Sequence, residues 1–289
     1  MEAFVPLPAN ETLPEALARN VRDALREDVG TGDWTARLVP RRPVSARVRV
    51  REEAVLCGRD WFEGCFRALD PAVRVDWRYD EGADMAADTP VCEVSGDSRA
   101  VLTAERSALN FLQLLSGTAT ATRRHVRAIE DASPNPRGCA VLDTRKTIPG
   151  LRLAQKHAVR VGGGVNQRLA LWDGILVKEN HIAAASGVAA AIERAFALHA
   201  GVDVQVEVEG LDQLREALAA GATSILLDNF TPERMREAVT LTAGRALLEA
   251  SGGVTLGQIR EIAATGVDRI SIGALTKDVR AVDFSMRLV

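Results

Sequence analysis

The chain has 289 residues, of which 47% are hydrophobic and 26% are charged, and its net charge at pH 7 is −3. This length can bury a large core in one or two domains, and the composition is that of an ordinary globular protein. Because the charges nearly cancel, the chain as a whole provides no field that would attract nucleic acid or an anionic membrane. No apolar run approaches the ~20 residues of a membrane span.

The N-terminal part begins without a targeting signal and then predicts a helix. Residues 1–8 contain no basic segment followed by an apolar one, so no signal peptide is expected. A helix is predicted over 12–28, because Thr12 can cap it, Pro14 suits its first turn, and leucine or valine recurs every four residues. The next segment, 27–35, places two glycines among acids and hydroxyls and is predicted to be a loop.

Residues 44–103 change to an alternating pattern that is typical of half-buried strands. Strands are predicted over 44–51, 73–79, 90–94 and 99–102, with a short helix over 60–69. Such alternation favours an antiparallel or mixed sheet in an α+β domain. Four cysteines, Cys57, Cys65, Cys92 and Cys139, form no Cys-x-x-Cys motif, and we expect reduced thiols in a cytoplasmic protein.

A long helical pattern over 104–130 separates this part from the rest of the chain. We place a domain boundary near residue 115, which gives an N-terminal domain, 1–115, and a C-terminal domain, 116–289. The segment from Val282 to Val289 could pack back on the first domain.

After residue 135, short apolar runs alternate with helical patterns. The runs are Ala140–Leu142, Ile175–Val177, Val204–Val208, Ser224–Leu227, Ala246–Leu248 and Arg269–Ile272. Buried, non-alternating strands joined by helices are typical of a parallel sheet, and six such units predict a closed α/β barrel.

Every predicted strand of this second domain ends in polar or ionisable residues. The six ends carry Asp143–Lys146, Lys178–His181, Glu207 with Glu209, Asp228–Asn229, Glu249 with Ser251–Gly253, and Ser271–Gly273 with Lys277. Because active sites of α/β barrels lie at the carboxyl ends of the strands, we expect these residues to share one rim and to form an active site there.

The types of residue at the predicted rim indicate an anionic ligand. Arg145, Lys146, Lys178 and Arg168 supply cations, and guanidinium groups suit carboxylates and phosphates. Glycines in 251–253 and 272–274 would let backbone N–H groups approach a phosphate.

The acidic and glycine-rich parts of this pattern leave alternatives open. Glu207 and Asp228 could hold Mg²⁺ against a polyphosphate, or they could only neutralise the nearby cations. The run Gly162–Gly164 could be a phosphate loop or a flexible turn, and His181 is a weaker candidate for the site.

Seven segments carry a resemblance to quinolinate phosphoribosyltransferase, a type II phosphoribosyltransferase that is also called nicotinate-nucleotide pyrophosphorylase (carboxylating). They are Glu105–Asn110, Leu142–Gly150, Gly162–Asn166, Lys178–His181, Glu207–Glu209, Leu227–Asn229 and Ser271–Thr276. The resemblance extends from about residue 20 to the C-terminus. It implies an N-terminal α/β sandwich, an incomplete parallel α/β barrel, and a homodimer with shared active sites.

The resemblance also implies roles for particular residues. Lys146, Lys178, Glu207 and Asp228 are implied to be catalytic, with Mg²⁺ held directly or indirectly by the two acids. Arg145 and Arg168 would bind the two carboxylates of quinolinate, and Arg106 would reach into the neighbouring subunit's site. The remaining implied substrate-binding residues are Thr144, Gln167, Ser251, Gly252, Gly253, Ile272, Gly273 and Ala274.

The implied reaction is phosphoribosyl transfer from phosphoribosyl pyrophosphate to quinolinate with decarboxylation, in the biosynthesis of NAD. One departure stands out, because the family usually has histidine where this chain has Gln167, and glutamine can donate a hydrogen bond but carries no charge. Three other readings remain: an aldolase with Lys178 as a Schiff base, a pyrophosphorylase for another ring acid, and a non-catalytic paralogue.

Overall fold

The computed structural model describes residues 10–289, and the chain divides into two compact units. Unit 1 comprises residues up to Ser116 together with Ala281–Val289, and unit 2 comprises Gly117–Arg280. The stretch 1–8, for which no signal peptide is predicted, lies outside the described residues. Among residues 10–289, no helix combines the length and the apolar character needed to cross a bilayer.

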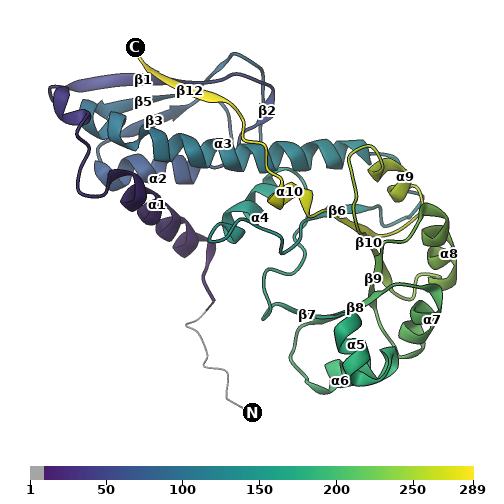
Figure 1. Cartoon of the computed structure of the whole chain (residues 1–289). Helices are drawn as coiled ribbons and strands as arrows, with labels where there is room; N and C mark the ends of the chain where they lie inside the picture. The colour runs from purple at the N-terminus through teal and green to yellow at the C-terminus, as the bar shows by residue number, and fades with distance from the viewer. Residues whose placement is uncertain (1–9) are drawn as a thin grey trace. The chain divides into compact units, whose positions relative to one another are not determined.

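Unit 1 contains an antiparallel sheet in the order β12-β1-β5-β3. Its elements are α1 (Leu13–Val29), a 3-10 turn (Ala36–Leu38), β1 (Pro43–Val50), β2 (Ala54–Val55), α2 (Arg59–Leu69), β3 (Arg74–Trp77), β4 (Asp84–Met85), β5 (Pro90–Asp97), the first part of α3 (Ser98–Ala128), and β12 (Phe284–Leu288). The chain's last strand, β12, pairs with β1, the first strand (Figure 1).

Local signals explain most of these elements, as α1 and α2 illustrate. The Thr12 hydroxyl and backbone N–H both donate to Glu15 Oε2, at 2.7 and 2.8 Å, at the start of α1. On α2, Trp61 and Phe62 are almost fully buried, and the Phe62 ring lies 5.3 Å from the Trp77 ring between centroids. The helix predicted over 60–69 therefore packs on the sheet through its aromatic face.

The strand predicted over 99–102 is wrong, because these residues belong to α3. The Asp97 carboxylate accepts hydrogen bonds from the backbone N–H groups of Arg99 (3.1 Å) and Ala100 (3.4 Å). This contact satisfies two N–H groups of the first turn, so the helix begins at Ser98. A short apolar run alone does not distinguish a strand from a buried turn of helix.

Unit 2 contains six parallel strands in the order β6-β11-β10-β9-β8-β7. The strands are β6 (Ala140–Leu142), β7 (Gly174–Val177), β8 (Asp203–Val208), β9 (Ser224–Asp228), β10 (Leu247–Ser251) and β11 (Arg269–Ser271). The helices are α4 (Arg152–Val161), α5 (Glu179–Ala185), α6 (Val188–Ala197), α7 (Leu211–Ala219), α8 (Pro232–Thr242), α9 (Ile259–Ala263) and α10 (Ala274–Lys277). Helices α5 to α9 follow one another around the outside of the strands (Figure 1).

The six strands do not close into a barrel, which corrects the closed barrel predicted from the strand pattern. In the described chain, β6 and β7 are the two edge strands and do not pair with each other. The free edge of β6 is instead occupied by Val165, whose N–H donates to Val141 O at 2.8 Å and whose carbonyl accepts from Asp143 N at 3.3 Å. The incomplete barrel implied by the family resemblance is confirmed.

Candidate active site

The carboxyl ends of the six strands meet at one edge, as the parallel registers require. Ser271 pairs with Leu142, Ser251 with Asp228, Val208 with Leu227, and Val177 with Val206. The residues that directly follow each pair are therefore neighbours. This arrangement groups most of the predicted site residues of unit 2 into three adjacent parts of a common rim.

The first part of the rim joins the end of β6 to the segment after β11. An added Cβ on Gly273 would lie 3.0 Å from Lys146 Cδ and 3.6 Å from Thr144 Oγ1, so the Lys146 stem lies against this glycine. Thr276 Oγ1 donates to Lys146 O at 2.7 Å, and Lys146 N donates to Thr144 Oγ1 at 3.0 Å. The Ile272 side chain is buried in the core and its N–H donates to Leu142 O at 2.9 Å. The exposed Lys146 side chain is thus carried by a well-fixed backbone.

The second part of the rim joins the ends of β9 and β10. Asn229 N donates to Ser251 O at 3.0 Å, and Asn229 Nδ2 donates to Asp228 Oδ2 at 2.8 Å. A Cβ on Gly252 would lie 2.1 Å from Asn229 Oδ1, and Gly252 has a φ of +107°, so only glycine suits this position. The Gly252–Gly253 backbone therefore lies beside Asp228.

The third part of the rim is an ion pair between neighbouring strands β7 and β8. Lys178 Nζ lies 3.0 Å from Glu207 Oε2, with 43% of the lysine side chain and 12% of the glutamate side chain exposed. Lys178 N donates to His181 Nδ1 at 3.0 Å, so this ring nitrogen is engaged at the start of α5. Glu207 thus neutralises one cation of the rim.

Two arginines lie near one another without an acidic partner. Burial and the nearby Arg145 charge both lower the pKa of Arg168. Arg168 Nη1 donates to Gly174 O at 2.7 Å, and Arg145 Nε is buried with no hydrogen-bond partner among the described residues. In the described chain, neither guanidinium forms an ion pair with a carboxylate. Two close, uncompensated guanidinium groups are suited to a ligand with two anionic groups.

Arg168 and Gln167 also line a cavity of about 500 Å³ beneath the rim. The first residues of β7, β8, β9 and β11 line the same cavity: Gly174, Asp203, Ser224 and Arg269. The segment that carries Gln167 and Arg168 therefore borders an open space rather than a packed core.

Two acids predicted at the rim are instead buried. Asp143 is fully buried and forms an ion pair with Lys156, which is 1% exposed. Burial is the largest effect on both groups, and it raises the pKa of Asp143 and lowers the pKa of Lys156. Glu249 is 1% exposed, and burial raises its pKa. Neither acid faces solvent.

A chain of hydrogen bonds connects Gln167 to Glu249. Gln167 Nε2 donates to Gln205 Oε1 at 2.9 Å, and Gln205 Nε2 donates to Glu249 Oε2 at 2.9 Å. Sequence reasoning missed Gln205 and Lys156. Gln205 offered one signal, a polar residue inside the apolar run Val204–Val208, whereas Lys156 in a helical pattern offered none.

We expect Glu249→Gln to change thermal stability in a pH-dependent way. The raised pKa of Glu249 means that its contribution to stability is present at low pH and is lost as the pH rises through the folded-state pKa. Glutamine does not ionise, so the melting temperature of the variant relative to the unmodified chain should increase from pH 5 to pH 8. Glu261→Gln, an exposed carboxylate on α9, is the control. A difference between Glu249→Gln and the unmodified chain that stays constant across this range would contradict the expectation.

The run Gly162–Gly164 has a packing role. A Cβ on Gly162 would lie 2.6 Å from Ala119 O and from Thr122 Cβ, both on α3. Arg123 on the same helix donates to Gly162 O and Val161 O, each at 3.0 Å. The glycine allows α3 to approach closely, which favours the turn interpretation over a phosphate loop.

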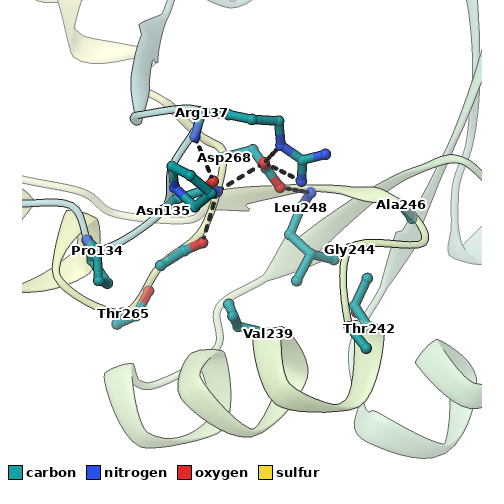
Figure 2. Close-up of a pocket in the computed structure, with 13 residues that line it drawn as sticks. Pro134, Asn135, Arg137, Val239, Thr242, Gly244, Ala246, Leu248, Thr265 and Asp268 are labelled. Atoms are coloured by element: carbon teal, nitrogen blue, oxygen red, sulfur yellow. Dashed lines mark hydrogen bonds and ion pairs between the residues drawn. The ribbon is translucent and has the colours of Figure 1, made fainter.

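A second cavity, of about 530 Å³, lies away from the rim (Figure 2). Asn135, Arg137 and Asp268 lie together on one of its walls, with Val239 and Thr242 among its other lining residues. Arg137 Nη2 lies 2.7 Å from Asp268 Oδ1. Because this arginine is already neutralised, the cavity lacks the free positive charge that distinguishes the rim.

Comparison with known proteins identifies both units. The family model described as the C-terminal domain of quinolinate phosphoribosyl transferase matches residues 118–287, and the model of the N-terminal domain matches 33–116. The nicotinate-nucleotide pyrophosphorylase [carboxylating] of Mycobacterium leprae is 39% identical over 285 residues, covering 95% of this chain and 98% of that protein. The probable nicotinate-nucleotide pyrophosphorylase of Bacillus subtilis is 40% identical over 262 residues, covering 90% of this chain and 89% of that protein.

Solved structures agree with the sequence comparisons. The nicotinate-nucleotide pyrophosphorylase of Francisella tularensis superposes with a TM-score of 0.91 at 42% identity, covering 99% of this chain and all of that chain. The likeness therefore extends over both units.

Proposed function

The chain belongs to the quinolinate phosphoribosyltransferase family, and we propose that it converts quinolinate and phosphoribosyl pyrophosphate into nicotinate mononucleotide, CO2 and pyrophosphate. The proposal is supported above all by Arg145 and Arg168, two neighbouring guanidinium groups without acidic partners. Quinolinate carries two adjacent carboxylates, and paired guanidinium forks match that arrangement.

The other rim residues suit the second substrate. Gly252, Gly253, Gly273 and Ala274 border the rim with accessible backbone, where N–H groups can hold the 5-phosphate. Lys146 is exposed beside Gly273, and it can balance charge on a phosphate or on the departing pyrophosphate. We assign Ser251 and Thr144 to the same phosphate-facing surface.

The reaction needs no covalent nucleophile from the protein. The pyridine nitrogen forms a bond to C1 of the ribose while the bond from C1 to pyrophosphate breaks. The transition state resembles an oxocarbenium ion, and Glu207 and Asp228 can stabilise that positive charge. The carboxylate on the adjacent ring carbon then leaves as CO2, and the neighbouring pyridinium nitrogen stabilises the electron pair left on that carbon. A proton from solvent then bonds to the same carbon, which gives nicotinate mononucleotide.

Glu207 and Asp228 also fit a magnesium role. Both are partly accessible carboxylates on neighbouring strands, and Mg²⁺ is usually bound by one or two carboxylates, waters and substrate phosphates. Bound there, Mg²⁺ would supply charge neutralisation for the pyrophosphate. The ion pair of Glu207 with Lys178 favours Asp228 as the more available ligand.

We further propose a cytoplasmic homodimer in which Arg106 completes the partner's site. Arg106 lies on α3 within unit 1, and its side chain is exposed. An exposed arginine on a regular helix is suited to reach an anion bound on a second copy of the chain.

The alternatives have less support. A Schiff-base lysine requires a desolvated setting, whereas the Lys178 side chain is 43% exposed and ion-paired with Glu207. The reading as a non-catalytic paralogue depended on Gln167 alone. The Gln167 side chain can donate one N–H to Gln205 and still offer its second N–H to a substrate.

A turnover assay tests the proposed function. The purified chain with quinolinate, phosphoribosyl pyrophosphate and Mg²⁺ should yield nicotinate mononucleotide and CO2 in equal amounts, and EDTA should abolish the product. Nicotinate in place of quinolinate should give no CO2. Absence of nicotinate mononucleotide would reject the proposal, and EDTA-resistant turnover would reject only the magnesium role.

A further inference from the structure

Asp143 and Lys156 form a buried hydrogen-bonded cluster that ends on the segment Asn166–Gln167. Lys156 Nζ donates to Asp143 Oδ1 and, at 2.9 Å, to Gln167 O. Asn166 Nδ2 donates to Asp143 Oδ2 at 2.6 Å and to Lys156 O at 2.9 Å, and Gln167 N donates to Asp143 Oδ1 at 3.0 Å. We call these four residues the clamp.

The clamp joins the two chain segments that carry the uncompensated arginines. Asp143 stands two residues before Arg145, and Gln167 directly precedes Arg168. In the described chain, Gln167 belongs to no helix or strand, so regular secondary structure does not hold it. The contacts to the Asp143 carboxylate therefore help to hold the segment before Arg168 against the strand end that precedes Arg145.

The chemistry of the clamp leaves little freedom of arrangement. All three groups that face the Asp143 carboxylate are donors: the Lys156 ammonium, the Asn166 amide and the Gln167 backbone N–H. A buried ion pair contributes little net stability, because the cost of desolvation offsets the attraction, and an apolar pair of the same volume is often as stable. A role in fixing geometry accounts for the pair better than a role in stability.

We propose that the clamp is a positioning device that sets the separation of Arg145 and Arg168, and thereby makes the site selective for an aromatic ring with two adjacent carboxylates. This inference rests on the proposed function, since it assumes that both arginines bind the dicarboxylate. The clamp residues are positioning residues, because they act through the arginines.

The variant Asn166→Ala tests the clamp without unbalancing its charges. It removes two hydrogen bonds and leaves the buried ion pair with its remaining partners. A misplacement of about 1 Å can cost up to 10²-fold in catalysis, so we expect KM for quinolinate to rise about ten-fold. KM for phosphoribosyl pyrophosphate should change less than about two-fold, because in the described chain the segments at 251–253 and 273–274 form no hydrogen bond with the four clamp residues.

A matched control is Asn135→Ala, in the wall of the cavity drawn in Figure 2. Asn135 is also half-buried, and its amide also donates two hydrogen bonds, to Gly266 O at 3.1 Å and to Asp268 Oδ1 at 2.9 Å. The Asn135→Ala variant should lose about as much thermal stability as Asn166→Ala, while its KM values for both substrates stay unchanged.

A double-mutant cycle separates positioning from a general loosening of the fold. If Asn166 acts through Arg168, Asn166→Ala should add no further rise in the quinolinate KM when combined with Arg168→Gln. The proposal would be overturned if the two substitutions raised the quinolinate KM additively. It would also be overturned if folded Asn166→Ala kept its quinolinate KM, or if its KM values for both substrates rose in parallel. Absence of turnover by the unmodified chain would instead overturn the proposed function, and the clamp's selectivity with it.

Discussion

Replacing Arg145 with alanine is expected to lower kcat/KM for quinolinate about 10²- to 10⁴-fold, because hydrogen bonds between charged groups contribute about 1.5–3 kcal/mol each and the guanidinium can make two. Most of the loss should appear in KM for quinolinate, since a carboxylate that does not react is bound equally in the ground state and the transition state. Steady-state kinetics with each substrate varied in turn provide the measurement. Thermal stability should not fall, because Arg145 Nε has no partner to lose among the described residues.

Two further variants sharpen this expectation. Arg145→Lys keeps the charge but not the fork, and it should recover only part of the loss. Arg137→Ala removes an arginine that is already paired with Asp268, so it should leave both KM values unchanged. If Arg145→Ala kept its quinolinate KM, the paired-arginine site would be wrong, even if the chain turned over its substrates.

The second large effect is expected from Arg106→Ala and Lys146→Ala, which should each reduce turnover about 10³-fold by removing a cation that faces developing negative charge. If Arg106 serves the neighbouring subunit's site, mixing the two inactive proteins under conditions of subunit exchange should restore activity. In a hybrid dimer, one site contains both changes and the other contains neither. With half of the dimers hybrid, the mixture should recover about a quarter of the unmodified activity.

Two controls are needed to interpret recovered activity as evidence for a shared site. Hybrid formation must be shown directly, for example by mass spectrometry of differently tagged chains. Mixing Lys146→Ala with Lys178→Ala should restore nothing if both lysines serve their own subunit's site. Hybrids of Arg106→Ala and Lys146→Ala without recovered activity would contradict a shared site, and recovery in the lysine mixture would contradict the assignment of both lysines to one subunit.

The motifs at the strand ends were predictable because they are local. An apolar run followed by a polar group identifies a buried parallel strand, and the carboxyl ends of such strands necessarily share one edge. The pairing of Ser271 with Leu142 and of Ser251 with Asp228 agrees with that rule. For the same reason, the sequence alone places Lys146, Lys178, Glu207 and Asp228 on a rim.

Other features depended on contacts that the pattern of apolar residues does not reveal. The segment 99–102 looked like a strand, but the Asp97 carboxylate captures the N–H groups of Arg99 and Ala100 and starts a helix. Closure of the barrel failed because Val165, and not β7, occupies the edge of β6. Neither outcome is encoded in a local period of hydrophobic residues.

By itself, the sequence determined the family, the six parallel strands and the identity of the rim's cations and acids, since each of these depends on contiguous residues. Only the tertiary structure decided which acids face the rim. Asp143 and Glu207 both stand at the carboxyl end of a strand, yet Asp143 is buried against Lys156 while Glu207 pairs with the half-exposed Lys178. The physical reason is that burial and partnership are properties of a three-dimensional neighbourhood. The clamp is the clearest case. The groups that donate to Asp143 come from a helix and a loop, and the strand pattern does not connect either of them to Asp143.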